Sequence, residues 1–167
     1  MQGAEVEFVA ASPGSLTAAE RSRFQELVVE AGEVVGAALS TNIDQARILV
    51  MVKQDDAVRG VAALKRPQMS YRQKIAGLAG IGLSEPTYPF ELGYIYIQPA
   101  LQGRGLSHQL VAEALSYSDG AGVFATVRTD NVAMRTALSK AGFSPSGEPY
   151  LGQQQRTIGL LLRPVQR

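Results

Sequence analysis

A short glycine-rich segment, Gln102-Gly103-Arg104-Gly105-Leu106-Ser107, contains the residue types that bind phosphate. It lies between a strand-like segment, residues 91–97, and a segment with helical periodicity that begins at Leu106. Such a turn brings free backbone N–H groups and the positive end of a helix dipole to one point, where phosphate oxygens bind well. The two glycines let the backbone approach a ligand, and Arg104 adds a positive charge. The segment therefore predicts a phosphate-binding loop.

Two common phosphate motifs do not fit this loop. A Walker loop requires a Lys after its last glycine, and the loop has none. A dinucleotide fingerprint requires a third glycine, where His108 stands, and an acidic residue about 20 positions later. The sequence there reads Val123-Phe124-Ala125-Thr126-Val127, which is typical of a buried strand. Neither kind of nucleotide site is indicated.

The loop and its surroundings resemble the GNAT superfamily of acyl-CoA-dependent N-acyltransferases. The loop is similar to the superfamily pattern Arg/Gln-x-x-Gly-x-Gly/Ala, with Ser107 in the last position. Before it, Ile95-Tyr96-Ile97-Gln98-Pro99 matches the strand end that precedes the superfamily loop. After it, Asn131 opens a helical segment that closes with Lys140-Ala141-Gly142-Phe143, as in superfamily members. The resemblance covers residues 91–143 closely and extends loosely, in the order of elements, to the whole chain.

The resemblance implies acetyl-CoA as the acyl donor and a reaction without a metal. The strand before the loop would bind the pantetheine arm through backbone groups, as an added strand does, at Ile95, Tyr96 and Ile97. Asn131 would contact the pantetheine or the cofactor edge, and it is equally well placed to cap the last helix. The residues that would cradle the pyrophosphate are Gln102, Gly103, Arg104, Gly105, Leu106, Ser107 and His108.

Acetyl transfer to an amine requires loss of an amine proton and stabilisation or protonation of the CoA thiolate. Many superfamily members carry a Tyr acid in the last helix, and some carry a Glu base on the preceding strand. Here those positions are Leu138 and Thr126. Thr126, Ser107 and Ser139 are the polar side chains expected near the thioester, and none stands out as a thiolate partner.

Glu91 is the best remaining candidate for the catalytic base. Other superfamily members carry a Glu near the start of this strand, where it acts through water. The alternative interpretation is a solvated Glu or one that forms an ion pair with a nearby Lys or Arg. Along its strand we expect Glu91 to share one face with Gly93, Ile95 and Ile97, and Tyr94 and Tyr96 to lie on the other.

The remaining elements predict a mixed α/β fold around one sheet. Thr17-Ala18-Ala19-Glu20 has the spacing of a capping box, and Gly32 is placed to end the helix that follows. Residues 65–90 are irregular and are expected to form a binding loop or lid. The resemblance implies a mostly antiparallel, twisted sheet of about six or seven strands, splayed beside the loop strand and flanked by about four helices. Strands are expected at 5–10, 48–52, 58–64, 91–97, 123–127 and 157–162, and helices from 17, 106 and 131, with a short helical piece through Val34, Val35 and Ala38.

Composition limits the protein class. The 167 residues are 46% hydrophobic and 19% charged with a net charge of +1, which fits a single globular domain over 1–167. The near-neutral charge argues against a nucleic-acid partner. The absence of cysteine and the single histidine argue against a thiolate or histidine-rich metal site. Without a recognisable secretion signal or a long apolar run, we expect a cytoplasmic protein with no membrane partner.

The sequence leaves the acceptor open among a small amine, an amino-acid-like compound and a peptide. The basic residues Lys65, Arg66, Arg72 and Lys74 would guide an anionic acceptor, bind the CoA 3′-phosphate, or form a solvated loop face. Tyr71, Tyr88, Phe90 and Tyr150 suggest an aromatic-lined pocket. A homodimer through the C-terminal strand is also open. The alternative to an acetyltransferase is a catalytically weak or inert acyl-CoA-binding protein with a binding or regulatory role.

Overall fold

The computed structural model describes residues 5–32 and 38–166 and contains one seven-stranded sheet in the order β1-β2-β3-β4-β5-β7-β6. Neighbouring strands are antiparallel except β4 and β5, which are parallel. The strands are β1 (Val6–Ala11), β2 (Ile48–Gln54), β3 (Ala57–Lys65), β4 (Phe90–Ile97), β5 (Val123–Arg128), β6 (Ser144–Leu151) and β7 (Thr157–Arg163). The α-helices are α1 (Ala18–Glu30), α2 (Leu39–Asp44), α3 (Met69–Ala79), α4 (Leu106–Leu115) and α5 (Val132–Lys140). The predicted α/β fold with a mostly antiparallel sheet is confirmed.

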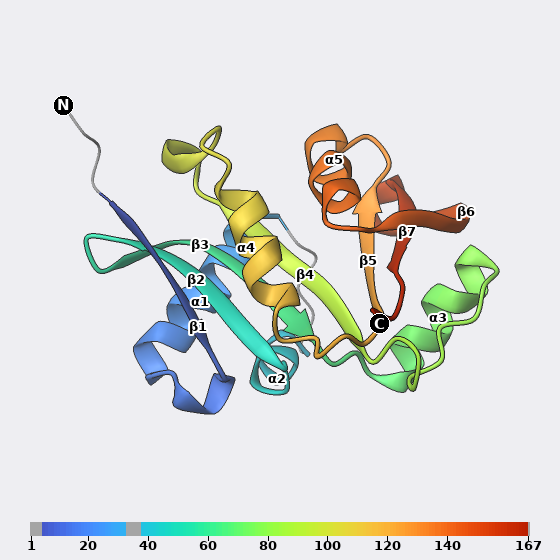
Figure 1. Cartoon of the computed structure of the whole chain (residues 1–167), viewed down its shortest axis with the longest axis horizontal. Helices are drawn as coiled ribbons and strands as arrows, with labels where there is room; N and C mark the ends of the chain where they lie inside the picture. Colours follow the sequence, from blue (N-terminus) through green and yellow to red (C-terminus); the bar gives the residue numbers. More distant parts are fainter. Residues whose placement is uncertain (1–4, 33–37, 167) are drawn as a thin grey trace.

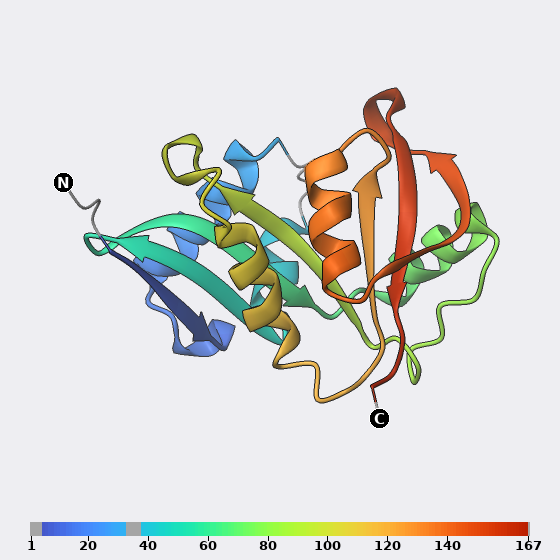
Figure 2. The same cartoon turned by 45° about the horizontal axis from the view of Figure 1, so that its top comes forward.

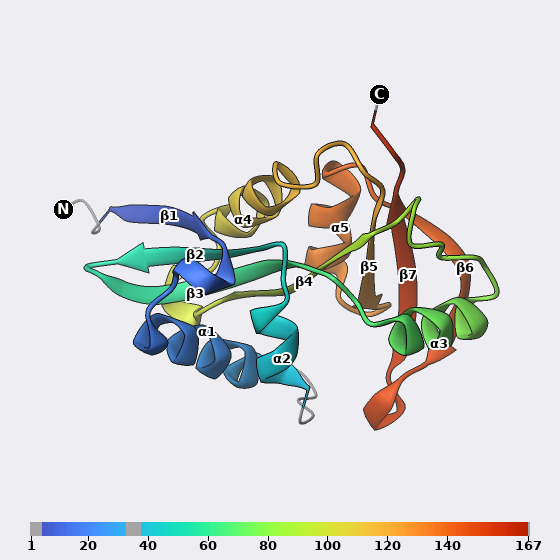
Figure 3. The ribbon, with the colours of Figure 1, turned by 90° about the horizontal axis from the view of Figure 1, so that it is seen from below.

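The helices form layers on both faces of the sheet. Helices α4 and α5 cover one face, and α1, α2 and α3 cover the other (Figure 3). Figure 1 shows the sheet as two halves, β1 to β4 and β5 to β7, which meet where β4 runs beside β5. Helices α4 and α5 pack against each other over this junction (Figure 2). The largest apolar core lies under α4 and α5 and is continuous across both halves, while the opposite face has one core under α1 and α2 and another under α3.

Several local predictions are confirmed. The Thr17 side chain accepts a hydrogen bond from the Glu20 N–H, and the Glu20 carboxylate accepts one from the Thr17 N–H, so the capping box starts α1. The α1 helix ends at Glu30, and Gly32 follows with φ +82°. Strand β2 is buried over residues 48–52, as its continuous apolar run predicts. Of the short helical piece expected at 34–38, Val34 and Val35 lie outside the described residues, and Ala38 is the N-cap of α2.

Helix α3 corrects the expectation that residues 65–90 are irregular. It occupies Met69–Ala79, and Gly80 in a left-handed conformation (φ +74°) ends it. Tyr71, Ile75 and Ala79 recur at helical spacing and pack toward the core under α3. The glycines and prolines around this stretch obscured the periodicity, although only Gly77 lies inside the helix.

Strand β6 was also not predicted, and it changes the expectation about a dimer. It carries Pro145 and Pro149 and is exposed or half-buried throughout, so it lacks the alternation that marks a strand. It forms one edge of the sheet, and it pairs with β7. The C-terminal strand β7 therefore has β5 and β6 on its two sides and offers no free edge for pairing with a second copy.

A bulge in β4 overturns part of the expected assignment of its faces. Val61 of β3 pairs with Tyr96 and Ala63 pairs with Gly93, so one residue of β3 opposes two of β4. Tyr94 lies in this bulge, and its backbone is left-handed, with φ +56°. Ile95 and Ile97 pack toward α4, and Tyr94 and Tyr96 pack toward α1 and α2, so the predicted separation of these two pairs is confirmed. Leu92 packs in the same core as Ile95 and Ile97, whereas Glu91 contacts Tyr71 of α3 on the opposite face. The prediction that Glu91 shares a face with Ile95 and Ile97 is wrong.

The predicted splay beside the loop strand is confirmed. Strands β4 and β5 pair only at Phe90 with Val123 and at Glu91 with Phe124, and they separate beyond these residues. The backbone of the rest of β4 therefore has no partner strand on the β5 side. Among the described residues, no helix is long and apolar enough to cross a membrane, and no group of three or more His, Cys, Asp or Glu is placed to hold a metal.

Arg72 has a structural role that separates it from the other basic residues of its segment. Its side chain is buried, and its guanidinium lies over the ring of Phe124, 5.4 Å from the centroid. One terminal nitrogen donates to the carbonyls of Leu83 (3.1 Å) and Tyr88 (2.6 Å), and the other donates to the carbonyl of Pro89 (3.4 Å). The side chain thus fixes the segment between α3 and β4.

We expect Arg72→Met to lower the free energy of unfolding by roughly 3 kcal/mol, because it leaves buried carbonyls without donors. Denaturant unfolding would measure this loss. Lys74→Met on the exposed side of the same helix is the matched control, with an expected change within about 0.5 kcal/mol. Equal losses in both variants would contradict the bracing role of Arg72.

Candidate active site

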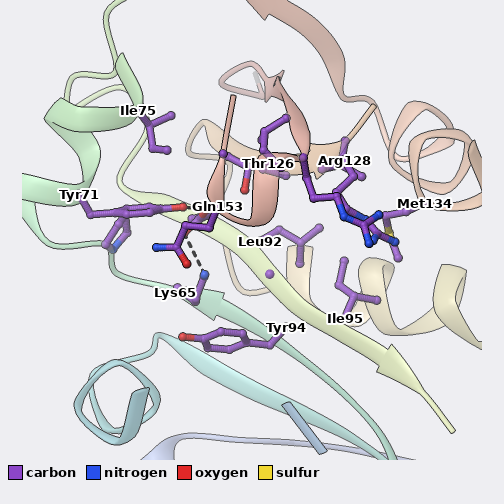
Figure 4. Close-up of a pocket in the computed structure, with 18 of the residues that line it drawn as sticks. Lys65, Tyr71, Ile75, Leu92, Tyr94, Ile95, Thr126, Arg128, Met134 and Gln153 are labelled. Atoms are coloured by element: carbon purple, nitrogen blue, oxygen red, sulfur yellow. Dashed lines mark hydrogen bonds and ion pairs between the residues drawn. The ribbon is translucent and has the colours of Figure 1, made fainter. Parts of the chain in front are cut away.

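A cleft of about 1100 Å³ opens where β4 and β5 separate (Figure 4). Strands β4 and β5 form its floor and α5 lies at one end, near Arg128 and Met134. Helix α3 and the turn Gln153–Gln155 between β6 and β7 lie at the other end. Helix α3 presents one side to the cleft through Tyr71, Lys74, Ile75 and Leu78.

Glu91 lies in this cleft in a fully hydrogen-bonded state. Its side chain is 3% exposed. Lys65 Nζ lies 3.0 Å from Oε1, and the Tyr71 hydroxyl donates to Oε2 at 2.7 Å. The Lys65 ammonium also lies 4.3 Å from the centroid of the Tyr94 ring. The ion pair considered as an alternative for Glu91 is therefore present, and an incoming amine would reach the carboxylate only through one of these partners.

Two tyrosines beside Glu91 have perturbed acidities. Burial raises the pKa of Tyr71 well above its ordinary value, and the charge of Glu91 and its hydrogen bond raise it further. Burial, with a smaller contribution from the Glu91 charge, raises the pKa of Tyr150 to about 12. Both phenols therefore remain protonated at neutral pH and act as hydrogen-bond donors.

The two positions at which relatives carry catalytic Tyr and Glu lie in the same cleft. Thr126 on β5 is half-buried and lines the cleft, and it forms a hydrogen bond with Tyr71. Leu138 on α5 is buried in the main core and also lines the cleft. The structure thus places one hydroxyl and one apolar side chain near the separation of the strands. Of the other two serines considered, Ser107 is half-buried and Ser139 is exposed, and neither lines the cleft among the described residues.

The glycine loop has the geometry expected of a phosphate site. Gly103 and Gly105 have φ +82° and +73°, and a Cβ at either position would meet no atom within 4 Å. Gly105 is the N-cap of α4 and provides no side-chain cap, so the first N–H groups of the helix are available to a ligand. Gln102, Arg104 and His108 are exposed, Ser107 is half-buried, and Leu106 is anchored in the core.

The predicted cofactor residues divide into two groups. Ile95, Tyr96, Gln102 and Asn131 line the same cleft as Glu91. The Tyr96 hydroxyl is engaged with Glu30 at 2.7 Å, which leaves the backbone of this residue as its free ligand-binding group. Asn131 caps α5 by accepting from the Met134 N–H at 3.2 Å, so its predicted capping role is confirmed. Residues 103–108 continue from Gln102 outside the cleft lining, and Ile97 is buried beneath it.

The sequence did not reveal the partnership of Lys65, Tyr71 and Glu91 or the position of Gln153. The three partners come from β3, α3 and β4, so their contact depends on the unpredicted α3. The periodicity of Tyr71, Ile75 and Ala79 was the available signal. Gln153 belongs to a turn in which Gln154 and Gln155 have φ +58°, and polar turns of this kind have no distinctive sequence pattern.

Comparisons with known proteins agree with this geometry. The family model described as acetyltransferase (GNAT) family matches residues 12–143. N-alpha-acetyltransferase RimI of Mycobacterium tuberculosis is 36% identical over 72 residues, which is 43% of this chain and 45% of RimI. The match thus spans less than half of that relative.

Solved structures share the fold at low sequence identity. An acyl-CoA N-acyltransferase from Pseudomonas aeruginosa superposes with a TM-score of 0.68 at 18% identity, over 95% of this chain and 99% of that one. The ribosomal-protein-S18-alanine N-acetyltransferase from Escherichia coli superposes with a TM-score of 0.67 at 13% identity, over 96% of each chain. At these identities the likeness establishes the architecture alone.

The Glu91 charge can be tested through Tyr71 and Tyr150, because it raises the pKa of both. We expect Glu91→Gln to lower the pKa of both Tyr71 and Tyr150, because the negative charge that opposes the tyrosinate is removed. Ultraviolet titration would record tyrosinate formation at lower pH, and Tyr71→Phe and Tyr150→Phe would assign the two transitions. Glu113→Gln on α4 serves as the control, and an unchanged titration in Glu91→Gln would contradict the geometry.

The raised pKa of Tyr150 predicts how the free energy of unfolding changes at alkaline pH. The folded pKa of Tyr150 is about 12 against an ordinary value of 10.0, so between these values the folded state retains a proton that the unfolded chain loses. The stabilisation that the protonated Tyr150 phenol gives the folded state is complete below pH 10 and is lost as pH rises toward 12. Denaturant unfolding across this range should show a steeper decline for the parent protein than for Tyr150→Phe, and parallel declines would contradict the shift.

Proposed function

Because the chain belongs to the GNAT family of acetyltransferases, we propose that it transfers the acetyl group of acetyl-CoA to a primary amine within a ternary complex. The amine nitrogen attacks the thioester carbonyl, the new C–N bond forms, and the C–S bond breaks to release CoA. The acceptor is a small amine, an amino-acid-like compound or a peptide amine. The name of the relative RimI, an N-alpha-acetyltransferase, supports a peptide α-amine as one member of this set. In this proposal, residues 1–167 form a single catalytic domain that acts in the cytoplasm.

The observation that supports the proposal most is the continuity of the cleft with the glycine loop. On the side away from β3, the β4 backbone from Ile95 to Ile97 has no partner strand and can add the pantetheine arm as a strand, although the Ile97 carbonyl accepts from the Gln102 side chain at 2.8 Å. Gln102 joins the cleft to the loop, whose N–H groups at the start of α4 suit the pyrophosphate. Arg104 and His108 stand at the exposed mouth of this path, and Asn131 lies along it.

Glu91 is the proposed proton acceptor and acts through a relay. Its carboxylate is almost inaccessible, and the Tyr71 hydroxyl already donates to it at 2.7 Å. The ammonium proton of the acceptor would pass to the Tyr71 oxygen as the phenol proton moves to Glu91. Lys65 holds the carboxylate in place by its ion pair.

The second candidate function is an acyl-CoA-binding protein that transfers poorly or not at all. Leu138 and Thr126 favour it, since relatives often carry catalytic side chains at these positions. The complete pairing of Glu91 also favours it. Calorimetric titration with acetyl-CoA and CoA, with ATP and NAD as controls, followed by an amine screen, separates the two candidates. Binding of the CoA species without turnover would select the inert binder, and no CoA binding would exclude both.

Replacing a loop glycine tests the pyrophosphate site. We expect Gly105→Glu to abolish CoA binding in calorimetry, because the new side chain occupies the approach to the helix N-terminus and adds a like charge. Gly80→Glu is a matched control, because Gly80 has φ +74° against +73° at Gly105 and equally open space around its Cα. Both variants carry the same backbone strain, so retained binding in Gly105→Glu would refute the assignment.

Replacing the proposed base tests the mechanism. Glu91→Gln should leave CoA affinity nearly unchanged and lower kcat at neutral pH by about a hundredfold, and the loss should shrink as pH rises and the free amine becomes more abundant. Tyr71→Phe should lower kcat in the same direction because it interrupts the relay. Glu113→Gln, outside the described cleft lining, is the control. Unchanged turnover in Glu91→Gln would remove this residue from the mechanism.

A further inference from the structure

The charge of the cleft differs sharply from that of the whole protein. The chain has a net charge of +1. The described residues that line the cleft include one acidic side chain, Glu91, and five basic ones, Lys65, Arg66, Lys74, Arg128 and Arg156. Lys65 already pairs with Glu91, so this pair is internally neutral. The remaining lining carries a positive excess that a ligand must match.

The phosphates of CoA do not account for all of this excess. Arg128 lies beside Met134 at the α5 end of the cleft, near the path proposed for the cofactor (Figure 4). Arg66 and Lys74 instead lie at the end of β3 and on α3. Helix α3 covers the opposite face of the sheet from α4, whose N-terminus carries the glycine loop (Figure 3). Arg156 shares Asp130 with Arg128 and so belongs to the α5 end of the cleft. We call the two side chains at the α3 end, Arg66 and Lys74, the basic wall.

The basic wall is exposed. Arg66 lies over the ring of Phe90, 5.9 Å from the centroid, which orients the guanidinium without cancelling its charge. Lys74 is exposed on the side of α3 that faces the cleft. Outside the wall, at the α5 end, Arg156 and Arg128 share Asp130 at 3.9 Å and 3.8 Å, so this carboxylate offsets part of their charge.

The other polar groups at this end are neutral and include several donors. Gln68 and Gln153 carry amides, and Tyr71 and Tyr150 carry phenols that stay protonated at neutral pH. A polycationic acceptor would lose hydration here without gaining a carboxylate partner, whereas a carboxylate would gain charge-assisted hydrogen bonds. The turn that carries Gln153 also holds two left-handed non-glycine residues, a strain that is typical of ligand-contacting segments.

We propose that the acceptor is an amine that also bears a carboxylate, and that the basic wall binds this carboxylate while the amine faces Tyr71 and Glu91. The proposal rests on the acetyltransferase function proposed above and specifies its substrate class. The shared chemistry is found in free amino acids and in peptides with an acidic residue near the N-terminus.

Matched acceptors test this substrate class. The probes are L-alanine with L-alaninamide, L-glutamate with L-glutamine, and peptides that begin Ala-Glu or Ala-Gln, with spermidine as the cationic probe. We expect the carboxylate member of at least one pair to be preferred about tenfold in kcat/KM. The first two pairs report a small acceptor and the third a peptide. Preference for the neutral members or for spermidine would overturn the proposal and leave the acetyltransferase function standing.

Charge reversal tests the wall itself. Lys74→Glu should remove most of the carboxylate preference, because it should raise KM for the carboxylate member about tenfold more than KM for the neutral member. Lys140→Glu makes the same change in net charge at an exposed site on α5 outside the described cleft lining and should preserve the preference. Equal effects of both variants would show a general charge effect and overturn the proposal.

Binding of a product-like ligand tests the wall independently of turnover. Calorimetry would compare N-acetyl-L-glutamate with N-acetyl-L-glutamine on the CoA-saturated protein. Stronger binding of the former, weakened by Lys74→Glu, supports the proposal, and equal or absent binding overturns it. Failure of CoA itself to bind would instead refute the proposed function. In that case, comparing N-acetyl-L-glutamate with N-acetyl-L-glutamine on the CoA-free protein would still show whether the basic wall binds a carboxylate.

Discussion

Strands β4 and β5 run parallel but share only two residue pairs, and the place at which they separate determines where a ligand can bind. Parallel neighbours in a sheet normally satisfy each other's backbone groups along their length. Here β4 carries the bulge at Tyr94, and on the face that α1, α2 and α3 cover, each half of the sheet has its own core. The separation leaves the rest of β4 without a partner strand on the β5 side and opens the cleft, which Gln102 at the start of the glycine loop also lines.

The polar cluster of Glu91, Lys65 and Tyr71 in this cleft satisfies itself through its own contacts. Glu91 would be costly to bury alone, because an unpaired carboxylate loses its hydration. Lys65 and Tyr71 each supply a donor, and they come from segments on both sides of the strand junction. The cluster therefore combines a structural role with the capacity to hold a proton, since Tyr71 connects the carboxylate to the open cleft.

The sequence predicted the parts of the fold whose signals are local. The glycine loop, the capping box at Thr17 and the cap at Asn131 depend on neighbours within a few residues, and each was located correctly. The bulge at Tyr94 was missed because no local sequence pattern marks a left-handed tyrosine, and strict alternation then placed Glu91 on the wrong face of β4. Helix α3 and strand β6 were missed because glycine and proline obscured their patterns. The Lys65–Glu91–Tyr71 contact followed from those tertiary features, so the sequence could give Glu91 only as an isolated candidate.

The position of α3 also bears on the order in which the protein folds. Ile75, Ala79 and Leu83 precede β4 in the chain, yet they complete a core with Phe124 and Leu160 of β5 and β7. Strands β2 and β3 are joined by the short turn at Asp55 and Asp56, so they can pair as soon as both are synthesised. The α3 segment must wait for about eighty further residues before its core partners are all synthesised, and such long-range contacts form slowly. A nascent chain that ends before β7 lacks Leu160, so the apolar side of α3 stays partly uncovered until this last strand is made.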